Sequence, residues 1–269
     1  MKTINIIILF VMILFSTSCK LVSNDRKNLS GKKYSTTISG KSFSEIEACS
    51  VFNITLHKSN EYKAKIEVPE EMKDNLIAEV NNGRLFLSLD NKDGQCIRFK
   101  ESDLRADIYL PSFETIDLSG MVSLRTSDTF NVDNVKILMS GASEIKGLPM
   151  TAAIIDVNTS GSSSIKAKIY TDKMYVRASG ASEIDLEPIG GKEGKQLEVN
   201  TSGSSEVDAY KLPFENVYIR CSGASEVSLY PTKRLEGRTS GSSDVEYKRI
   251  SKEVNIDIMS SGASSIKSK

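Results

Sequence analysis

Eight copies of one short phrase constrain this chain more than any other feature of its sequence. Between Ser119 and Ile266, Ser-Gly is followed by two mostly small residues, a variable residue and an aliphatic residue, as in SGASEI and SGSSEV. The glycines of the copies follow one another at a nearly constant spacing and are Gly120, Gly141, Gly161, Gly180, Gly203, Gly223, Gly241 and Gly262. A period of about 20 residues is typical of a stacked solenoid, in which each repeat needs its neighbours to bury its apolar face.

Within each repeat, residues alternate between aliphatic or small and polar. Around Gly203, for example, Leu197, Val199 and Val207 alternate with polar residues such as Glu198. This alternation predicts strands, because successive side chains of a strand point to opposite faces. We expect the glycine to take a positive φ and to bend the chain between two strands. The sequence therefore predicts an all-β parallel β-helix or solenoid, right-handed, with about 20 residues per repeat.

A serine stands two residues after the glycine in each of the last seven copies and faces inward in this scheme. A buried hydroxyl needs a hydrogen-bond partner, which could be a neighbouring hydroxyl about 4.8 Å away in the next coil or a backbone group. The serines are Ser143, Ser163, Ser182, Ser205, Ser225, Ser243 and Ser264.

A longer period of two repeats is superimposed, because SGA and SGS copies alternate from Gly141 onward. The SGA copies carry Tyr175 with Arg177 and Tyr218 with Arg220 at outward positions before the glycine. We expect one coil per repeat, and a coil of two repeats with two corners is the alternative. The alternation would place these tyrosines and arginines on a common face or on every second coil. These four residues are the candidate binding surface, since Tyr and Arg offer large contact area.

The first residues predict export. An apolar stretch, residues 4–15, follows Lys2 and is followed by Ser16-Thr17-Ser18-Cys19. The stretch is too short for a membrane span and is typical of a secretory signal. The cysteine after small residues resembles the lipobox of bacterial lipoproteins, which implies cleavage before Cys19 and acylation on it; ordinary cleavage is the alternative. Outer-membrane anchoring is expected, on either side of that membrane.

The chain is expected to divide into four parts: a signal peptide (1–18), a tether (19–38), a β-rich N-terminal cap (39–110) and the Ser-Gly solenoid (111–269). In the cap, the segments 43–46, 51–56, 62–68 and 85–89 read as strands, and Asn81-Asn82-Gly83 as a hairpin turn. We expect one short helix from Pro69 to Ala78, with Met72, Leu76 and Ile77 on one face.

Composition excludes some functions. Lys+Arg and Asp+Glu are balanced at 35 each, without a basic block, so no nucleic-acid partner is expected. No cysteine or histidine cluster has the spacing of a metal site, and no cofactor is expected. Cys221 falls at an inward small-residue position, and pairing of Cys49 with Cys96 is left open.

The order of these segments carries a family resemblance. It resembles the GIN head domain of putative auto-transporter adhesins across about residues 40–269, on Phe43 to Ile46, Val51 to Leu56, Tyr62 to Val68, Leu76, Asn82-Gly83-Arg84-Leu85, Ala106 to Pro111 and Leu118-Ser119-Gly120. The resemblance implies a β-helical fold akin to pectate-lyase-like solenoids without catalytic residues, carried by exported lipoproteins with a role in adhesion.

We therefore expect a non-enzymatic adhesin or binding scaffold that contacts the membrane through its lipid and a glycan or envelope protein through its surface. A carbohydrate-active β-helix enzyme and an envelope-stress or signalling accessory are the alternatives. The single histidine, His57, reads as a surface residue. A column of acids three residues after the glycine could bind Ca²⁺ or form a solvated outer row, which we favour. Its members are Glu144, Glu183, Glu206, Glu226 and Asp244.

Overall fold

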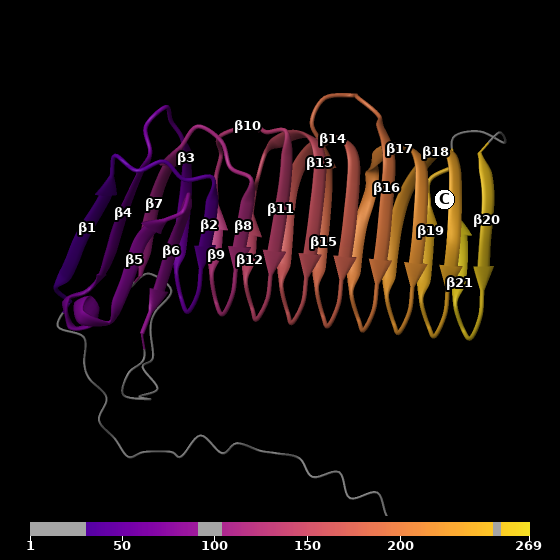
Figure 1. Cartoon of the computed structure of the whole chain (residues 1–269). Coiled ribbons are helices and arrows are strands. Elements are labelled where there is room, and N and C mark those ends of the chain that lie inside the picture. Colours follow the sequence, from indigo (N-terminus) through magenta and orange to yellow (C-terminus); the bar gives the residue numbers. More distant parts are fainter. Residues whose placement is uncertain (1–30, 91–103, 250–253) are drawn as a thin grey trace, which may run out of the picture.

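The computed structural model describes residues 31–90, 104–249 and 254–269, and it is a β-solenoid (Figure 1). Each glycine of the repeat lies directly against the glycine of the preceding copy, so one copy makes one coil. The prediction of one coil per repeat is thus confirmed, and a coil made of two repeats is wrong. No helix in the described ranges is long and apolar enough to cross a membrane.

Two parallel strand layers form the stack. The strands that lead into the glycine corners form what we call the upstream face, and the strands that leave them form the downstream face. The upstream face contains β2 (Glu45–Ala48), β8 (Thr115–Leu118), β11 (Asn134–Met139), β13 (Met150–Thr159), β16 (Gly194–Thr201), β20 (Asn255–Ser260) and the second halves of β14 (Ser164–Ala178), β17 (Glu206–Cys221) and β18 (Glu226–Thr239).

The downstream face uses the first halves of β14, β17 and β18 together with short strands. These are β3 (Asn53–Lys58), β9 (Ser123–Arg125), β12 (Glu144–Lys146), β15 (Glu183–Pro188), β19 (Asp244–Tyr247) and β21 (Ser265–Ser268). Where the coils close, β10 (Phe130–Asn131) pairs with the start of β13.

The core lies between the two faces and follows the predicted columns. Leu197 and Val199 are 0% exposed and Val207 is 1% exposed, and their counterparts in neighbouring coils lie beside them in register. Full burial of such a side chain stabilises the fold by about 1.5–3 kcal/mol. Because each coil repeats the same contacts, the apolar column is the main source of stability along the stack.

The corner needs glycine for two reasons. Gly203 has a φ of +74°, a backbone conformation that side-chain-bearing residues rarely adopt. A Cβ added there would also lie 2.5 Å from the backbone oxygen of Gly180 in the preceding coil. The predicted bend is therefore confirmed, and the close stacking of successive corners is a second constraint on these glycines.

The inward serines find their partners within their own coil. Ser205 Oγ donates to the carbonyl oxygen of Ser202 at 2.9 Å, three residues earlier in the chain, and the same bond recurs in the other six copies. The backbone alternative is thus the correct one, and a bond between hydroxyls of stacked coils is wrong. The carbonyl three residues earlier is closer because the glycine corner folds back on itself.

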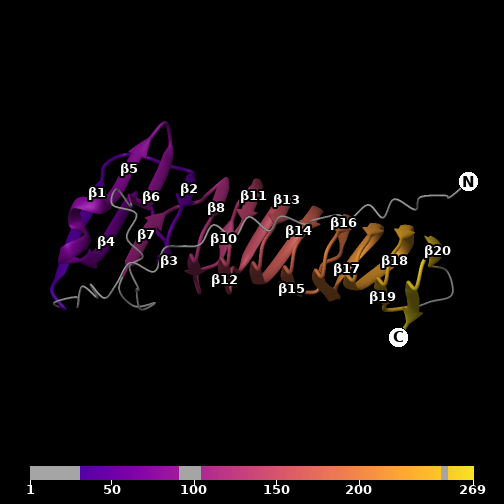
Figure 2. The same ribbon diagram turned by 90° about the horizontal axis from the view of Figure 1, so that it is seen from below.

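Residues 31–90 form the wider end of the stack (Figure 2). β2 and β3 continue the two faces, and Ser50, with a φ of 75°, occupies the corner next to Gly120. Antiparallel strands then cover this end: β1 (Lys33–Ser39) pairs with β4 (Lys63–Pro69), β4 with β7 (Arg105–Leu110), and β5 (Leu76–Asn81) with β6 (Arg84–Leu89).

The predicted helix from Pro69 to Ala78 is wrong in type and length. A 3₁₀ helix spans only Glu70–Asn75, with Met72 buried, and Leu76 begins strand β5. The predicted hairpin turn is confirmed, with Asn82 and Gly83 at φ values of 49° and 78°. Strand β5 pairs with β6 through this turn, and Leu76 and Ile77 lie opposite Leu89 and Ser88. A helix through Ala78 would break this strand pairing.

Candidate functional site

Two outward rows run along the upstream face across successive coils. The acid–tyrosine row, five residues before each glycine from Gly161 onward, consists of Asp156, Tyr175, Glu198, Tyr218, Glu236 and Asp257, in register. The arginine–asparagine row, three residues before, consists of Asn158, Arg177, Asn200, Arg220, Arg238 and Met259.

The structure therefore brings all four residues of the predicted binding surface onto one face. Tyr175 and Arg177 are separated from Tyr218 and Arg220 by one coil, which carries Glu198 and Asn200. The two placements that the alternation left open are both true, because these residues share a face and also occupy every second coil. The tyrosines are half-buried and the arginines are exposed.

Two shallow hollows follow these rows between the side chains and the serine corners. The first has a volume of about 540 Å³, and its lining residues come from successive coils, the first being Asp117 and the last Ser202. The second has a volume of about 910 Å³, and its lining residues likewise come from successive coils, the first being Gln196 and the last Met259. Both include Asn200 and Thr201, so they meet at β16. Together they cross eight strands, from β8 to β20, which corresponds to about 34 Å at about 4.8 Å per strand.

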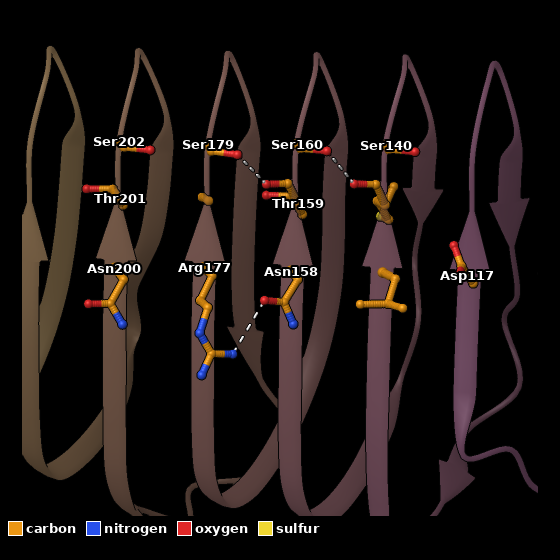
Figure 3. A pocket seen from close by; sticks show the side chains of 13 residues that line it. Asp117, Ser140, Asn158, Thr159, Ser160, Arg177, Ser179, Asn200, Thr201 and Ser202 are labelled. Atoms are coloured by element: carbon orange, nitrogen blue, oxygen red, sulfur yellow. Dashed lines mark hydrogen bonds between the residues drawn. The ribbon is translucent and has the colours of Figure 1, made fainter.

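In the first hollow, the polar side chains of the lining form hydrogen bonds within the protein. Arg177 Nη1 donates to Asp156 Oδ1 at 2.9 Å and to Asn158 Oδ1 at 3.4 Å, and Asn158 Nδ2 donates to Asp156 Oδ1 at 2.9 Å. Figure 3 shows Asn158, Arg177 and Asn200 side by side on adjacent strands, below the row of serines. The guanidinium of Arg177 is thus held by a carboxylate and an amide of the preceding coil.

The second hollow is arranged differently. Asn200 Nδ2 donates to Glu198 Oε1 at 3.0 Å, and Arg234 forms an ion pair with Glu236. Arg220 and Arg238 are register neighbours, and neither forms an ion pair with a carboxylate of residues 31–90, 104–249 or 254–269. The two adjacent guanidiniums of this hollow therefore remain available to a ligand.

The downstream face carries the acidic column. Glu183, Glu206, Glu226 and Asp244 follow one another in register. Burial, and then the charges of Glu226 and Glu183, raise the pKa of Glu206 above its usual range. Lys166 Nζ lies 3.5 Å from Glu183 Oε1 at one side of the column. The part of the chain that the structure describes contains no group of three acidic, histidine or cysteine side chains that could hold a metal ion.

His57 and Cys49 lie apart from these rows, whereas Cys221 directly follows Arg220 and lines the second hollow. His57 Nε2 is 3.1 Å from Asp107 Oδ1, and its ring stacks on Tyr109 with centroids 4.6 Å apart. Cys221 is buried as predicted, and burial raises the pKa of its thiol. Cys49 is half-buried.

Two cysteines of the sequence analysis lie outside the described residues. These are Cys96, the proposed partner of Cys49, and Cys19, the proposed acylation site. That pairing and that acylation stay predictions.

Arg238 was missed as a candidate by reasoning from the sequence. It occupies the same position before its glycine as Arg177 and Arg220, but Glu236, not tyrosine, precedes it by two residues. The Tyr-X-Arg pattern therefore excludes it, whereas a comparison of outward positions by column would have found it.

Comparison with known proteins gives a consistent result. A family model described as "Putative auto-transporter adhesin, head GIN domain" matches residues 42–249. A solved structure described as a putative lipid binding protein from Parabacteroides distasonis is 22% identical, with a TM-score of 0.77, and covers 89% of this chain and 98% of its own.

Two further solved structures are described as putative adhesins. The one from Parabacteroides distasonis is 16% identical, with a TM-score of 0.75, covering 90% of this chain and 98% of its own. The one from Parabacteroides merdae is also 16% identical, with a TM-score of 0.75, covering 89% and 97%. At these identities the likeness shows the fold. No curated protein matches the chain.

Proposed function

Because the chain belongs to the family of putative auto-transporter adhesin head GIN domains, we propose that it is a lipid-anchored envelope protein that binds a ligand without transforming it. The membership itself supports an adhesin-like binding role and the solenoid fold. The lipid anchor, the absence of catalysis and the surface that binds are our proposal.

The observation that carries this proposal is the repeated pair of rows on the upstream face. Tyr175 with Arg177 and Tyr218 with Arg220 present the same groups twice, along one open strip. A surface of this kind binds through several weak contacts that add through multivalency. An enzyme of this fold would instead concentrate its chemistry in one coil, and neither hollow is built in that way.

The anchor is proposed from the sequence around Cys19. Small residues directly precede this cysteine after an apolar segment, which matches the pattern of acylated lipoproteins. An acyl chain on its sulfur would hold the solenoid at the outer membrane. The predicted tether (19–38) is too long at its end, because Lys33–Ser39 form strand β1 of the fold, so only the residues between Cys19 and Lys33 would separate the solenoid from the bilayer.

A binding array tests the proposal. A soluble fragment that begins near Ser30 contains every described residue and would be applied to glycans and envelope components, with and without Ca²⁺. We expect binding to at least one component, unchanged by EDTA. Loss of binding with EDTA would show that the acidic column takes part, and chemical turnover of a bound glycan would contradict the proposal.

A further inference from the structure

We propose that the second hollow binds an acidic polysaccharide, whose carboxylate or sulfate groups pair with Arg220 and Arg238. The inference rests on the proposed binding function and specifies the chemistry of its ligand. It follows from the pairing of charges, from the shape of the hollow and from the groups that line it.

The pairing of charges distinguishes the second hollow from the first. Arg177 in the first hollow is bound to Asp156 at 2.9 Å, so its charge is compensated within the protein. In the second hollow, Glu236 is paired with Arg234, which lies two residues before it on the same strand. Glu198 and Asp257 also line this hollow; Glu198 accepts a hydrogen bond from the neutral amide of Asn200, so its charge is not compensated, and neither carboxylate pairs with Arg220 or Arg238.

Arg220 and Arg238 are thus left beside each other in adjacent coils, and no described carboxylate, Asp257 in the lining of the hollow included, forms an ion pair with either. Like charges opposite each other on adjacent strands, about 4.8 Å apart, repel. An anion placed between them would offset this repulsion. The guanidinium is also the side-chain group best suited to carboxylate, sulfate or phosphate, because its planar fork donates two parallel hydrogen bonds.

The shape of the hollow favours a polymer. It is open and crosses four strands, β16, β17, β18 and β20, so its long direction follows the stack and not a single strand. At β16 it continues into the first hollow, whose lining includes Arg177, two coils away from Arg220. A linear chain lying along the stack would meet these groups in succession.

The lining groups favour a sugar chain. Tyr218 offers a flat, half-buried ring, and Gln196, Asn200, Ser222 and Ser240 offer amide and hydroxyl groups for the hydroxyls of a sugar. A membrane surface is a poorer match. The large hydrophobic residues that the described ranges expose are Met121 and Met259, and only Met259 lies at this hollow.

Binding to immobilised polymers tests the inference. The full chain would be compared on polygalacturonate, which carries carboxylates, on dextran sulfate and on neutral dextran. We expect binding to one or both acidic polymers and none to dextran. The double variant R220S/R238S should weaken binding at least tenfold, which corresponds to about 1.4 kcal/mol. R220K should be intermediate, because lysine keeps the charge and loses the planar fork.

The matched control is K166S/K168S, which removes the same charge from the downstream face. An equal loss of binding in this control would show a general electrostatic effect and overturn the inference. Melting temperatures would confirm that both double variants are folded, and the two single serine variants serve if R220S/R238S is not.

Other outcomes separate this inference from the proposed function. Binding to dextran as strong as to the acidic polymers would overturn the anionic specificity and leave the binding role intact. Binding only to phosphatidylglycerol vesicles, lost in R220S/R238S, would replace the polysaccharide with a membrane surface. Failure on every polymer, vesicle and array component would contradict both.

Discussion

At the scale of single residues, two positions three residues apart show how differently the fold treats its repeat. Gly203 lies in a corner where a side chain would meet the backbone of the preceding coil, and its φ is +74°. Glu206 lies on the outer surface of β17. Substitution should therefore be costly at the first position and nearly neutral at the second, although both belong to the same six-residue phrase.

Replacing Gly203 by Val should lower the free energy of unfolding by about 1–3 kcal/mol or more, because it forces a branched side chain into a positive φ against backbone. Replacing Glu206 by Val should change it by no more than about 0.5 kcal/mol. Thermal or urea unfolding would measure both. Equal losses would mean that the assignment of columns is wrong.

The acidic column should make stability depend on pH. The pKa of Glu206 is raised in the folded state, so the folded protein binds this proton more tightly than the unfolded chain does. The wild type is therefore stabilised as pH falls through that pKa and loses this contribution as pH rises.

Glu206→Gln should accordingly raise the melting temperature at pH 7 by about 1 °C, and the gain should disappear near pH 4. Glu61→Gln, at an exposed turn position, is the control and should show no such dependence. A gain that is larger at pH 4 than at pH 7 would contradict the assigned direction of the shift.

At the scale of elements, the corner between two strands in the SGS copies contains one buried hydroxyl that donates a hydrogen bond and one that has no hydrogen-bond partner in the described part of the chain. The serine two residues after the glycine donates to a carbonyl in its own coil. The threonine two residues before the glycine, in the SGS copies, has a buried hydroxyl without a partner among the described residues, at Thr159, Thr201 and Thr239. A buried hydroxyl without a hydrogen bond destabilises the folded state.

Thr159→Val should therefore increase the free energy of unfolding by about 1 kcal/mol, since Val keeps the branched shape and removes the unpartnered oxygen. Thr159 lies between Met139 and Ala178 in its column, so the new methyl group meets apolar neighbours. The matched control is Thr151→Val, which breaks a 2.7 Å bond to Asn131 and should destabilise. Stabilisation by both variants, or by neither, would refute this account.

Periodicity predicted most of the strands, because each position of the repeat occurs in several copies and the copies agree on which residue type stands there. Leu197, Val199 and Val207 could be placed in the core since their counterparts in other copies agree. The N-terminal strands had only one copy each, and there the helix was predicted wrongly. The partner of Ser205 was also undecided, because local alternation fixes the side of a strand on which a hydroxyl lies and not the nearest acceptor.

At the scale of the whole molecule, the upstream face is a strip that joins successive coils. Its groups come from residues far apart in the sequence, and the parallel register places them in line. Binding energy along such a strip should be shared among coils, with no single residue essential.

Replacing Tyr175 and Tyr218 together by Ser should weaken binding to an array ligand or to a cell surface more than either single change. Folding should be intact, because both side chains lie on the outer face and are only half-buried. Affinity measurements and melting curves would test this. A single solenoid substitution that abolished a measurable turnover would point to an enzyme instead.

Cys19→Ala should release the protein from membranes or leave an uncleaved precursor, because it removes the sulfur proposed to be acylated. Fractionation and metabolic labelling with a fatty-acid analogue would measure this. Cys49→Ala is the control and should keep the label. Absence of label in the wild type would end the idea of a lipid anchor.

The sequence predicted the members of the strip better than its chemistry. Tyr175, Arg177, Tyr218 and Arg220 could be assigned to it from their spacing. Arg177 forms an ion pair with Asp156, whereas Arg220 forms none with a described carboxylate. The Tyr-X-Arg pattern is the same in both coils, so the sequence alone does not show which arginine reaches a carboxylate. Arg238 belongs to the strip through register alone.

The alternation of coils also limits how a gene for this molecule can change in length. Loss of the single coil 181–203 would keep the fold continuous but set Tyr175 directly beside Tyr218. Loss of the two coils 181–223 would set Tyr175 beside Glu236, the same neighbourhood that it has now beside Glu198. Recombination that preserves the alternation of the acid–tyrosine row must therefore add or remove coils in pairs, and the lineage of such proteins should grow in steps of about 40 residues.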